Sequence, residues 1–180
     1  MPLVADARDA AAVAALFDGA EQALGGTPDV VVYNAAQRVR GALVEVDPEA
    51  VAQAVDVTAI GAFRVAQQAV RHMLPEHHGA VLFTGASAGV KGFARSAAFA
   101  MGKFALRGLA QSMARELAPQ GIHVAHIVID GSIRPAGAPI DGADAQLDAD
   151  AIAATYVQLL AQPRSAWSWE IEVRPWVERF

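Results

Sequence analysis

The stretch Val30–Ala36, "VVVYNAA", decides the fold class of this chain. A continuous β-branched run is typical of a strand buried on both faces, and such strands belong to parallel sheets that helices cover on both sides. Two further runs have the same character, "GAVLFTGAS" at 79–87 and "IHVAHIVI" at 122–129. The run "WSWEIEV" at 167–173 alternates instead, with tryptophan, isoleucine and valine on one face and serine and glutamate on the other.

Helical patterns separate these strands. Each begins beside a capping or helix-breaking residue and carries apolar side chains at helical spacing. The predicted helices are 9–24 with Asp9 as cap, 48–74 with Asp47 as cap, 96–118, and 148–162 beginning at Asp148. Strands joined by helices, with no hairpin signals, indicate right-handed βαβ units. We therefore predict an α/β fold with a doubly wound parallel sheet, in a single domain spanning residues 1–180.

The composition excludes several classes of protein. Hydrophobic residues make up 54% of the 180 residues and charged residues 18%, which argues against disorder. The net charge of −5 argues against nucleic acid as a partner, because phosphate binding needs a basic surface. The absence of cysteine excludes disulfides and thiolate catalysis. No signal-peptide pattern or membrane-length apolar stretch is present, so we expect a cytoplasmic protein with no membrane partner.

Four short motifs, in order along the chain, resemble those of one family. "ADARD" at 5–9 resembles an Asp-Val turn beside an adenine, and "YNAA" at 33–36 resembles an Asn-Ala-Gly turn. "FAMGK" at 99–103 stands where Tyr-x-x-x-Lys belongs, and "GIHVAHIVIDG" at 121–131 resembles a strand and turn that usually end in Pro-Gly. Together they cover nearly the whole chain, which resembles the short-chain dehydrogenase/reductase family, with its Rossmann-like fold and its NAD or NADP cofactor.

The resemblance implies a set of cofactor and active-site positions. The residues that would contact NAD or NADP are Asp6, Ala7, Asn34, Ala35, Ala36, Lys103, Asp130 and Gly131. The family's catalytic Asn, Ser, Tyr and Lys fall on Thr58, Ala86, Phe99 and Lys103. Only the lysine keeps the family's residue type. Ser87 is one residue out of register with the serine position, and a small loop shift would bring it in as a substitute.

These departures remove the family's acid–base step. In the family, the phenol transfers a proton to or from the substrate oxygen while hydride moves to or from nicotinamide, and the lysine charge favours the phenolate. The Phe99 ring has no titratable proton. Loss of a positioned acid typically costs a factor of about 10²–10⁴ in rate, and loss of the carbonyl donor costs more. Neighbouring hydroxyls could orient a carbonyl, but none replaces the phenol unaided.

A second departure concerns the phosphate loop. The family's first strand, glycine-rich turn and helix do not appear, so we expect a sheet that lacks the first two βα units, about 50–60 residues. "TGASAGVKG" at 84–92 follows a later strand, and we reject it as a displaced phosphate loop. "VVVYN" then becomes an apolar edge, and "LVADA" at 3–7 loses its partner strand. Either the chain start is truncated or misplaced, or another chain or a rearranged N-terminus covers this edge.

Ordinary structural roles compete with functional ones at some positions. Phe99 and Lys103 could be a core ring and a solvated amine, although the surrounding landmarks favour a degenerate active-site pair. His123 and His126 are three residues apart on a predicted strand, where they face opposite sides, which disfavours a metal site.

Two functional hypotheses follow. The first is an NAD(P)-dependent oxidoreductase homologue, catalytically impaired, with a small-molecule substrate near the loop at 130–146. The second is a non-catalytic scaffold that acts through dimer or heteromer contacts. Small residues on the helices at 48–74 and 96–118 permit close helix approach. Because the family's dimer interface uses these helices, the resemblance implies a homo-oligomer formed through them.

Overall fold

Four parallel strands form the sheet. The computed structural model describes residues 1–139 and 145–178, and within them the strand order is β1-β2-β3-β4. The strands are β1 (Val30–Tyr33), β2 (Gly79–Thr84), β3 (Ile122–Ile129) and β4 (Glu170–Val173). Each strand pairs in parallel with the next, as Val81 and Val124 do in register between β2 and β3. The α/β class and the parallel sheet expected from the sequence are confirmed.

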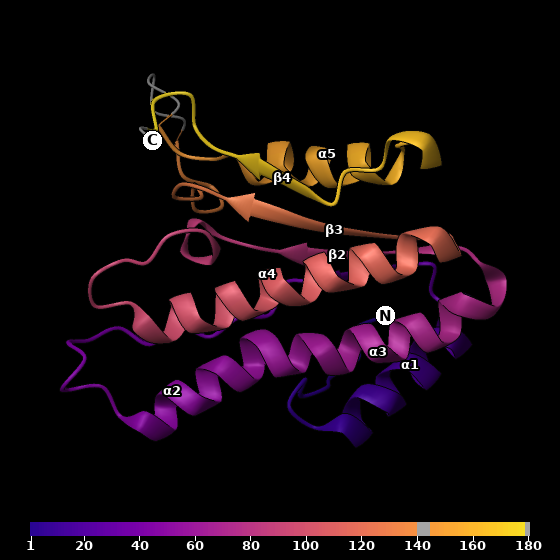
Figure 1. Ribbon diagram of the computed structural model, residues 1–180, viewed down its shortest axis with the longest axis horizontal. Coiled ribbons are helices and arrows are strands. Elements are labelled where there is room, and N and C mark those ends of the chain that lie inside the picture. The colour runs from indigo at the N-terminus through magenta and orange to yellow at the C-terminus, as the bar shows by residue number, and fades with distance from the viewer. Residues whose placement is uncertain (140–144, 179–180) are drawn as a thin grey trace.

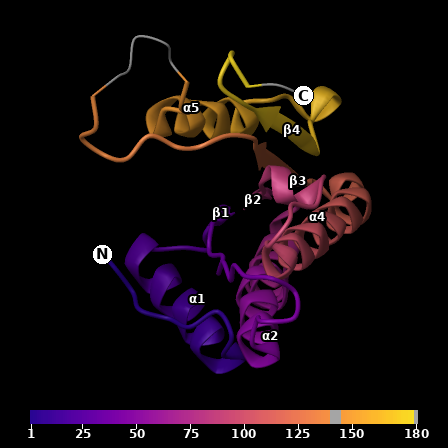
Figure 2. The same ribbon diagram turned by 90° about the vertical axis from the view of Figure 1, so that its left-hand side faces the viewer.

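Helices cover both faces of the sheet (Figures 1 and 2). One layer contains α1 (Ala10–Leu24), α2 (Pro48–Val55), α3 (Gly61–Met73) and α4 (Ala97–Leu117). The opposite layer contains α5 (Ala149–Leu160). Short helical turns follow or join these elements: η1 (Asp56–Ile60), η2 (Leu74–Glu76), η3 (Ser87–Gly89), η4 (Ala118–Gln120) and η5 (Arg164–Ala166). A core lies between the sheet and each layer, and alternate residues of β2, such as Phe83 and Leu82, point into one core or the other.

Aspartates begin three of these helices, as their place in the sequence predicts. The Asp9 carboxylate accepts hydrogen bonds from the backbone N–H groups of Ala11 and Ala12 at the start of α1. Asp47 and Asp148 cap α2 and α5 in the same way. Each cap satisfies amides that the first helical turn leaves without partners and places a negative charge at the positive end of the helix.

The first strand corrects one expectation and confirms another. β1 is not buried on both faces, because Val30 is 41% exposed and Val32 is 48% exposed. It is the edge strand that the sequence predicted, paired only with β2 among the described residues. The segment "LVADA" at 3–7 forms no strand. An extended segment needs a neighbouring ladder to satisfy its backbone groups, and none lies beside this one in the described part of the chain.

The last strand is shorter than its alternating pattern predicts. A backbone bend at Trp169 precedes β4, so the face pattern breaks there. Trp169 packs against the core under α4, whereas Ile171 and Val173 pack against the core under α5. Glu170, which the alternation places on the serine and glutamate face, has a side chain that is 18% exposed and bonds to Arg107.

A π-helical turn interrupts the long helix predicted over 48–74. This turn, η1, lies between α2 and α3 and contains Thr58, which is 1% exposed. The Tyr33 hydroxyl donates a hydrogen bond to the Val57 carbonyl in the turn. Gly102 of α4 lies so close that a Cβ there would be 2.8 Å from Thr58 Cβ. The absence of a side chain at Gly102 thus lets α4 pack directly on this turn.

Candidate active site

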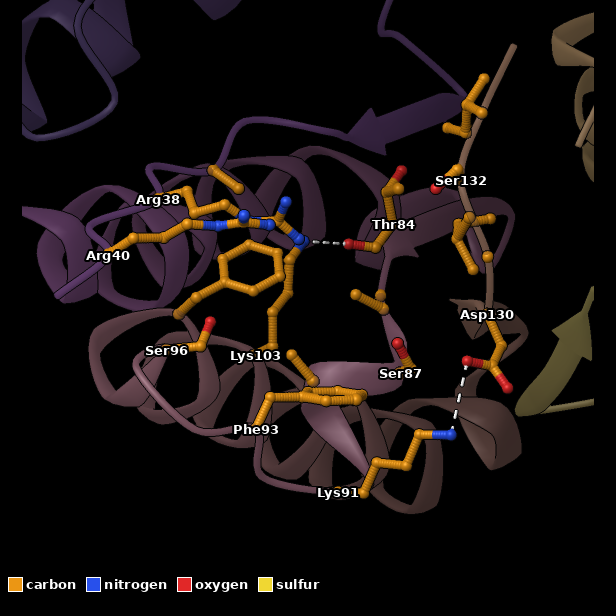
Figure 3. A pocket seen from close by; sticks show the side chains of 18 of the residues that line it. Arg38, Arg40, Thr84, Ser87, Lys91, Phe93, Ser96, Lys103, Asp130 and Ser132 are labelled. Atoms are coloured by element: carbon orange, nitrogen blue, oxygen red, sulfur yellow. Dashed lines mark hydrogen bonds and ion pairs between the residues drawn. The ribbon is translucent and has the colours of Figure 1, made fainter. Parts of the chain in front are cut away.

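A cavity of about 910 Å³ opens at the carboxyl ends of β2 and β3, where parallel α/β sheets usually bind ligands (Figure 3). Its lining residues come from the ends of strands, from the segments that follow all four strands, and from the first turns of α4. They include Ala36, Arg38 and Arg40 after β1, residues 84–88, 91 and 93–96 from the end of β2 onward, Phe99 and Lys103 on α4, residues 129–133 from the end of β3 onward, and Glu178 after β4. The topology thus brings distant parts of the sequence to one edge of the sheet.

Most of the predicted active-site residues meet at this cavity. Ala86, Ser87, Phe99 and Lys103 all line it. Thr58 does not line it, but its Oγ1 accepts a hydrogen bond from the backbone N–H of Gln37, 3.2 Å away.

The predicted cofactor residues are divided between two places. Ala36, Lys103, Asp130 and Gly131 line the cavity. Ala7, Asn34 and Ala35 instead line an apolar groove between α1 and β1. Asp6 lines neither, and its carboxylate pairs with Arg8 at 2.7 Å. The Asp6 carboxylate, which the resemblance places beside adenine, is therefore already hydrogen-bonded to Arg8. These hydrogen bonds lower the pKa of Asp6 to about 2.

The Lys103 ammonium is buried and has a backbone partner. Its Nζ donates to the carbonyl oxygen of Thr84 at 2.6 Å, and the residue is 3% exposed. Burial, followed by the nearby charge of Arg38, lowers the pKa of Lys103 to about 8. The amine therefore lies at the base of the cavity with its donor directed to the end of β2.

Two cations lie close to the Phe99 ring: this amine and a guanidinium that the sequence reasoning missed. The Cζ atom of Arg38 is 4.3 Å from the ring centroid, and the Nζ atom of Lys103 is 5.7 Å from it. Stacking of a guanidinium on an aromatic face is favourable through the ring quadrupole. The signal that could have located this residue is the pair of arginines in "QRVR" at 37–40, directly after the Asn-Ala-Ala turn of an acidic chain.

The serine position has lost its hydroxyl, but hydroxyls remain nearby. Ala86 is in extended conformation, and Ser87 begins the turn η3. Ser87, Ser96 and Ser132 line the cavity from three different segments (Figure 3). The cavity therefore retains hydrogen-bonding groups, although the residue at 86 itself offers none from its side chain.

Asp130 occupies the place where the resemblance expects proline. It is 5% exposed, and its carboxylate lies 3.7 Å from Lys91 Nζ and 3.5 Å from an Arg174 nitrogen. Its backbone N–H donates to the Val173 carbonyl at 2.9 Å, which a proline could not do. Asp130 thus ties the end of β3 to β4 and to the loop after η3.

A second polar network lies behind the cavity, between α4, β3 and β4. Glu170 accepts two hydrogen bonds from the Arg107 guanidinium, at 2.6 and 2.7 Å, and one contact of 3.0 Å joins it to His126 Nδ1. The Arg107 hydrogen bonds lower the pKa of Glu170, and burial lowers the pKa of His126. His126 and His123 face opposite sides of β3, as predicted, since His123 stacks instead on Trp167 with ring centroids 4.7 Å apart. Among the described residues, no group of three or more acidic, histidine or cysteine side chains could hold a metal.

Comparison with known families decides the relationship. Residues 1–134 match the family model described as short chain dehydrogenase. The chain belongs to the short-chain dehydrogenase family.

Similarity to individual family members agrees with this. The chain is 36% identical over 122 residues to human 17-beta-hydroxysteroid dehydrogenase type 1, covering 68% of this chain and 36% of the relative. It is 34% identical over 129 residues to inactive 2-(S)-hydroxypropyl-CoM dehydrogenase 2 of Xanthobacter autotrophicus, covering 72% of this chain and 55% of the relative. The chain thus spans about a third to a half of these curated relatives.

Solved structures show the same fold. A short-chain dehydrogenase from Rhodopseudomonas palustris aligns with a TM-score of 0.80 and 35% identity, covering 95% of this chain and 72% of that one. A metagenomic short-chain oxidoreductase in complex with NADP aligns with a TM-score of 0.81 and 26% identity, covering 96% of this chain and 73% of that one.

The described residues do not fit a whole nicotinamide dinucleotide of the kind short-chain dehydrogenases use. By the resemblance, Lys103 and Asp130 correspond to the family's nicotinamide positions, but the described residues supply no glycine-rich phosphate cradle. Carboxylates cap the N-termini of α1, α2 and α5, which disfavours phosphate at those three helix ends. The family's phosphate loop joins the first strand to the first helix, and no such glycine-rich strand–turn–helix lies within residues 1–139 and 145–178.

No helix within residues 1–139 and 145–178 combines the length and apolar character needed to cross a bilayer.

Proposed function

We propose that this chain is a short-chain dehydrogenase homologue whose cavity binds a small molecule but whose acid–base step is impaired. One observation carries the proposal: the residue that the resemblance aligns with the family's phenol is Phe99, a hydrocarbon ring that lines the cavity with the Cζ atom of Arg38 4.3 Å from its centroid. The ring has no proton to transfer, and the guanidinium is a poor proton donor because its pKa is far above neutrality.

The neighbouring groups support the same conclusion. The one cationic donor beside Phe99 on its own helix, Lys103, is hydrogen-bonded to the Thr84 carbonyl. Ala86 supplies no hydroxyl to hold a carbonyl oxygen. The name of one relative, at 34% identity, describes that protein as inactive, which shows that loss of activity occurs among similar chains.

The cofactor of this chain would be NAD or NADP, as in the NADP complex of its metagenomic neighbour. Because three helix N-termini carry carboxylates, we propose that residues 1–180 alone bind either dinucleotide only weakly. Calorimetric titration with NADH and NADPH tests this point. We expect no heat of binding at micromolar concentrations of either dinucleotide, and a micromolar dissociation constant would contradict the proposal.

A turnover experiment tests the impaired chemistry. We expect the parent chain to oxidise NADPH with ketones or aldehydes no faster than its Lys103→Met variant, at the highest soluble cofactor concentration. The double variant Phe99→Tyr, Ala86→Ser restores the phenol and the hydroxyl, and we expect it to exceed the parent by about 10²-fold or more.

The matched control places the same phenol elsewhere on the same helix. Phe104→Tyr adds a hydroxyl to a ring that is 45% exposed, outside the cavity lining, and should leave the rate at the parent's level. Robust turnover by the parent that Lys103→Met abolishes would overturn the proposal. So would a double variant that gains no more than Phe104→Tyr does.

A second candidate function, a scaffold acting through its helices, has its own observation. Four large apolar side chains are 45–55% exposed on η1, α3 and α4: Ile60, Phe63, Met101 and Phe104. The helices α3 and α4 run side by side in front of the sheet in Figure 1. We propose a homo-oligomer formed through the helices at 48–74 and 96–118, because apolar patches rimmed by polar residues mark contact surfaces.

A further inference from the structure

The charge of the cavity is opposite to that of the chain. The net charge of the 180 residues is −5, yet the cavity is lined by more cations than anions. The cationic side chains are Arg38, Arg40, Lys91, Arg95 and Lys103, and the acidic ones are Asp130 and Glu178. A cleft lined by one sign of charge concentrates ligands of the other sign.

Most of these cations lack a carboxylate. Lys91 lies 3.7 Å from Asp130, which accounts for one pair. Arg38, Arg40 and Arg95 form no ion pair within 4.0 Å with any residue of the described ranges. Figure 3 shows the side chains of Arg38 and Arg40 reaching from the loop after β1 toward Lys103.

The fold holds these arginines at the cavity. Arg38 stacks on the buried Phe99 ring, and the preceding residue, Gln37, is bonded to the Thr58 hydroxyl at 3.2 Å. The backbone N–H of Gly41 donates to the Arg95 carbonyl at 3.2 Å, which joins the two arginine-bearing loops. Arg95 itself adopts a left-handed φ of 59°, a conformation that non-glycine residues rarely adopt without a constraint.

The arrangement is electrostatically unfavourable while the cavity lacks an anion. Arg38 and Lys103 both lie within 6 Å of one ring centroid, and the charge of Arg38 contributes to the lowered pKa of Lys103. An anion between them would relieve this repulsion and would find several donors. Arginine binds carboxylate and phosphate through two parallel N–H groups, which makes it the preferred partner for planar or tetrahedral oxyanions.

We propose that the cavity selects a small organic molecule bearing an oxyanion, a carboxylate or a phosphate ester, held by Arg38 and Arg40. The apolar part of the molecule lies against Phe93 and Ile133 on the cavity wall. This inference rests on the proposed function, since it names the ligand class of the same cavity. The dinucleotide's own phosphates are the other source of an oxyanion, so the test separates them.

The test is a set of calorimetric titrations at low ionic strength, without any reducible substrate. The probes are benzoate, benzyl phosphate, the neutral isostere benzamide, and NADP⁺. We expect benzoate and benzyl phosphate to bind and benzamide to bind at least about 10-fold more weakly, since a charge-assisted pair contributes about 1.5 kcal/mol or more. The benzoate affinity should fall as sodium chloride is added.

Variants locate the binding. The double variant Arg38→Gln, Arg40→Gln should bind benzoate about 10-fold more weakly than the parent, or weaker still. Arg115→Gln removes the same charge from the last turn of α4, away from the cavity lining, and should change nothing. Arg38→Lys keeps the positive charge but loses the two parallel N–H donors of the guanidinium, and it should retain part of the affinity for benzoate. This variant keeps the test informative if a thermal melt shows that the double variant is unfolded.

Several results would overturn the inference. Equal binding of benzamide and benzoate would do so, as would equal losses in Arg115→Gln and in the double variant. Binding of NADP⁺ but not of benzoate would assign the arginines to the cofactor instead. These titrations measure binding and not turnover, so a negative result would leave the proposal of impaired chemistry unaffected. Robust ketone reduction by the parent chain would refute the impaired chemistry but would not bear on the preference for anionic ligands.

Discussion

The guanidinium of Arg38 lies over the ring of Phe99, with 4.3 Å between its Cζ atom and the ring centroid. By the resemblance, the family has a titratable phenol at position 99, whereas here a permanent cation lies against a hydrocarbon ring. The charge of Arg38 also acts on Lys103, since it adds to the effect of burial in lowering the pKa of that amine. One residue of the loop after β1 therefore contributes to the electrostatics on both sides of this contact.

Removal of Arg38 should raise the pKa of Lys103. The pKa is lowered to about 8 mainly by burial and secondarily by the Arg38 charge. In Arg38→Gln the burial remains and the repulsion disappears, so the pKa moves up toward the ordinary value. Titration of the Lys103 side chain by NMR of labelled lysine measures it, with Arg115→Gln as control. A pKa that stays put or falls would show that the two cations do not interact.

Acidification should destabilise the protein through His126. Burial lowers the pKa of His126 in the folded state from its ordinary 6.5, so the unfolded chain takes up the proton first. Stability from this residue is complete above about pH 6.5 and is lost as the pH falls below that value. Urea unfolding at about pH 7.5 and about pH 5.5 should show a smaller loss in His126→Gln than in the parent. Identical losses in both proteins would contradict the prediction.

Glu170 should contribute more to stability than its neighbour Glu172. Glu170→Gln removes the carboxylate from two Arg107 hydrogen bonds at a side chain that is 18% exposed. We expect unfolding free energy to fall by roughly 2–3 kcal/mol, the range for hydrogen bonds to charged groups. Glu172→Gln affects a carboxylate that is itself more exposed, at 35%, and should cost about 1 kcal/mol or less. Equal costs in chemical denaturation would refute the importance of the buried network.

Gly102 should tolerate no side chain, in contrast to Gly92. A Cβ at Gly102 would approach Thr58 Cβ to 2.8 Å, whereas a Cβ at Gly92 would meet nothing within 4 Å. Gly102→Ala forces α4 away from the π-helical turn, and overpacking of this kind costs about 1–3 kcal/mol. Gly92→Ala should be nearly neutral. Thermal unfolding of both variants measures the difference, and a neutral Gly102→Ala would mean that the two elements separate freely.

Charges on the outer face of the α3 and α4 helices should dissociate the proposed oligomer. Phe63→Glu and Phe104→Glu place carboxylates at side chains that are 47% and 45% exposed. We expect light scattering after gel filtration to show a mass corresponding to one chain. Val157→Glu alters a 65%-exposed apolar residue on α5, in the opposite layer, and should leave the mass unchanged. An oligomer that survives both phenylalanine substitutions would exclude this face.

The elements that the sequence predicts well are those with local causes. Asp9, Asp47 and Asp148 bond to amides two or three residues away, so a helix start is visible in a few letters. The runs at β2 and β3 are continuous because both of their faces are buried. The clustering of Ala86, Phe99 and Lys103 followed from the spacing of motifs on a known topology.

The features that the sequence could not supply depend on contacts between distant segments. Arg38 meets Phe99, and Glu170 meets His126, across separations of about 40 to 60 residues. The alternation at 167–173 placed Trp169, Ile171 and Val173 on one face, because a period of two cannot reveal the bend at Trp169. β1 was expected to be buried because its composition is that of a central strand, whereas its exposure depends on which strands flank it.

The hydrogen bond from Gln37 to Thr58 links the loop that carries Arg38 to the π-helical turn. By the resemblance, Thr58 stands at the position of the family's asparagine, and its hydroxyl anchors the residue beside Arg38. A return to asparagine would have to fit beside Gly102 and would loosen the arginine loop at the same step. Substitutions at residues 38, 58 and 99 are thus expected to be non-additive, because these residues share one chain of contacts.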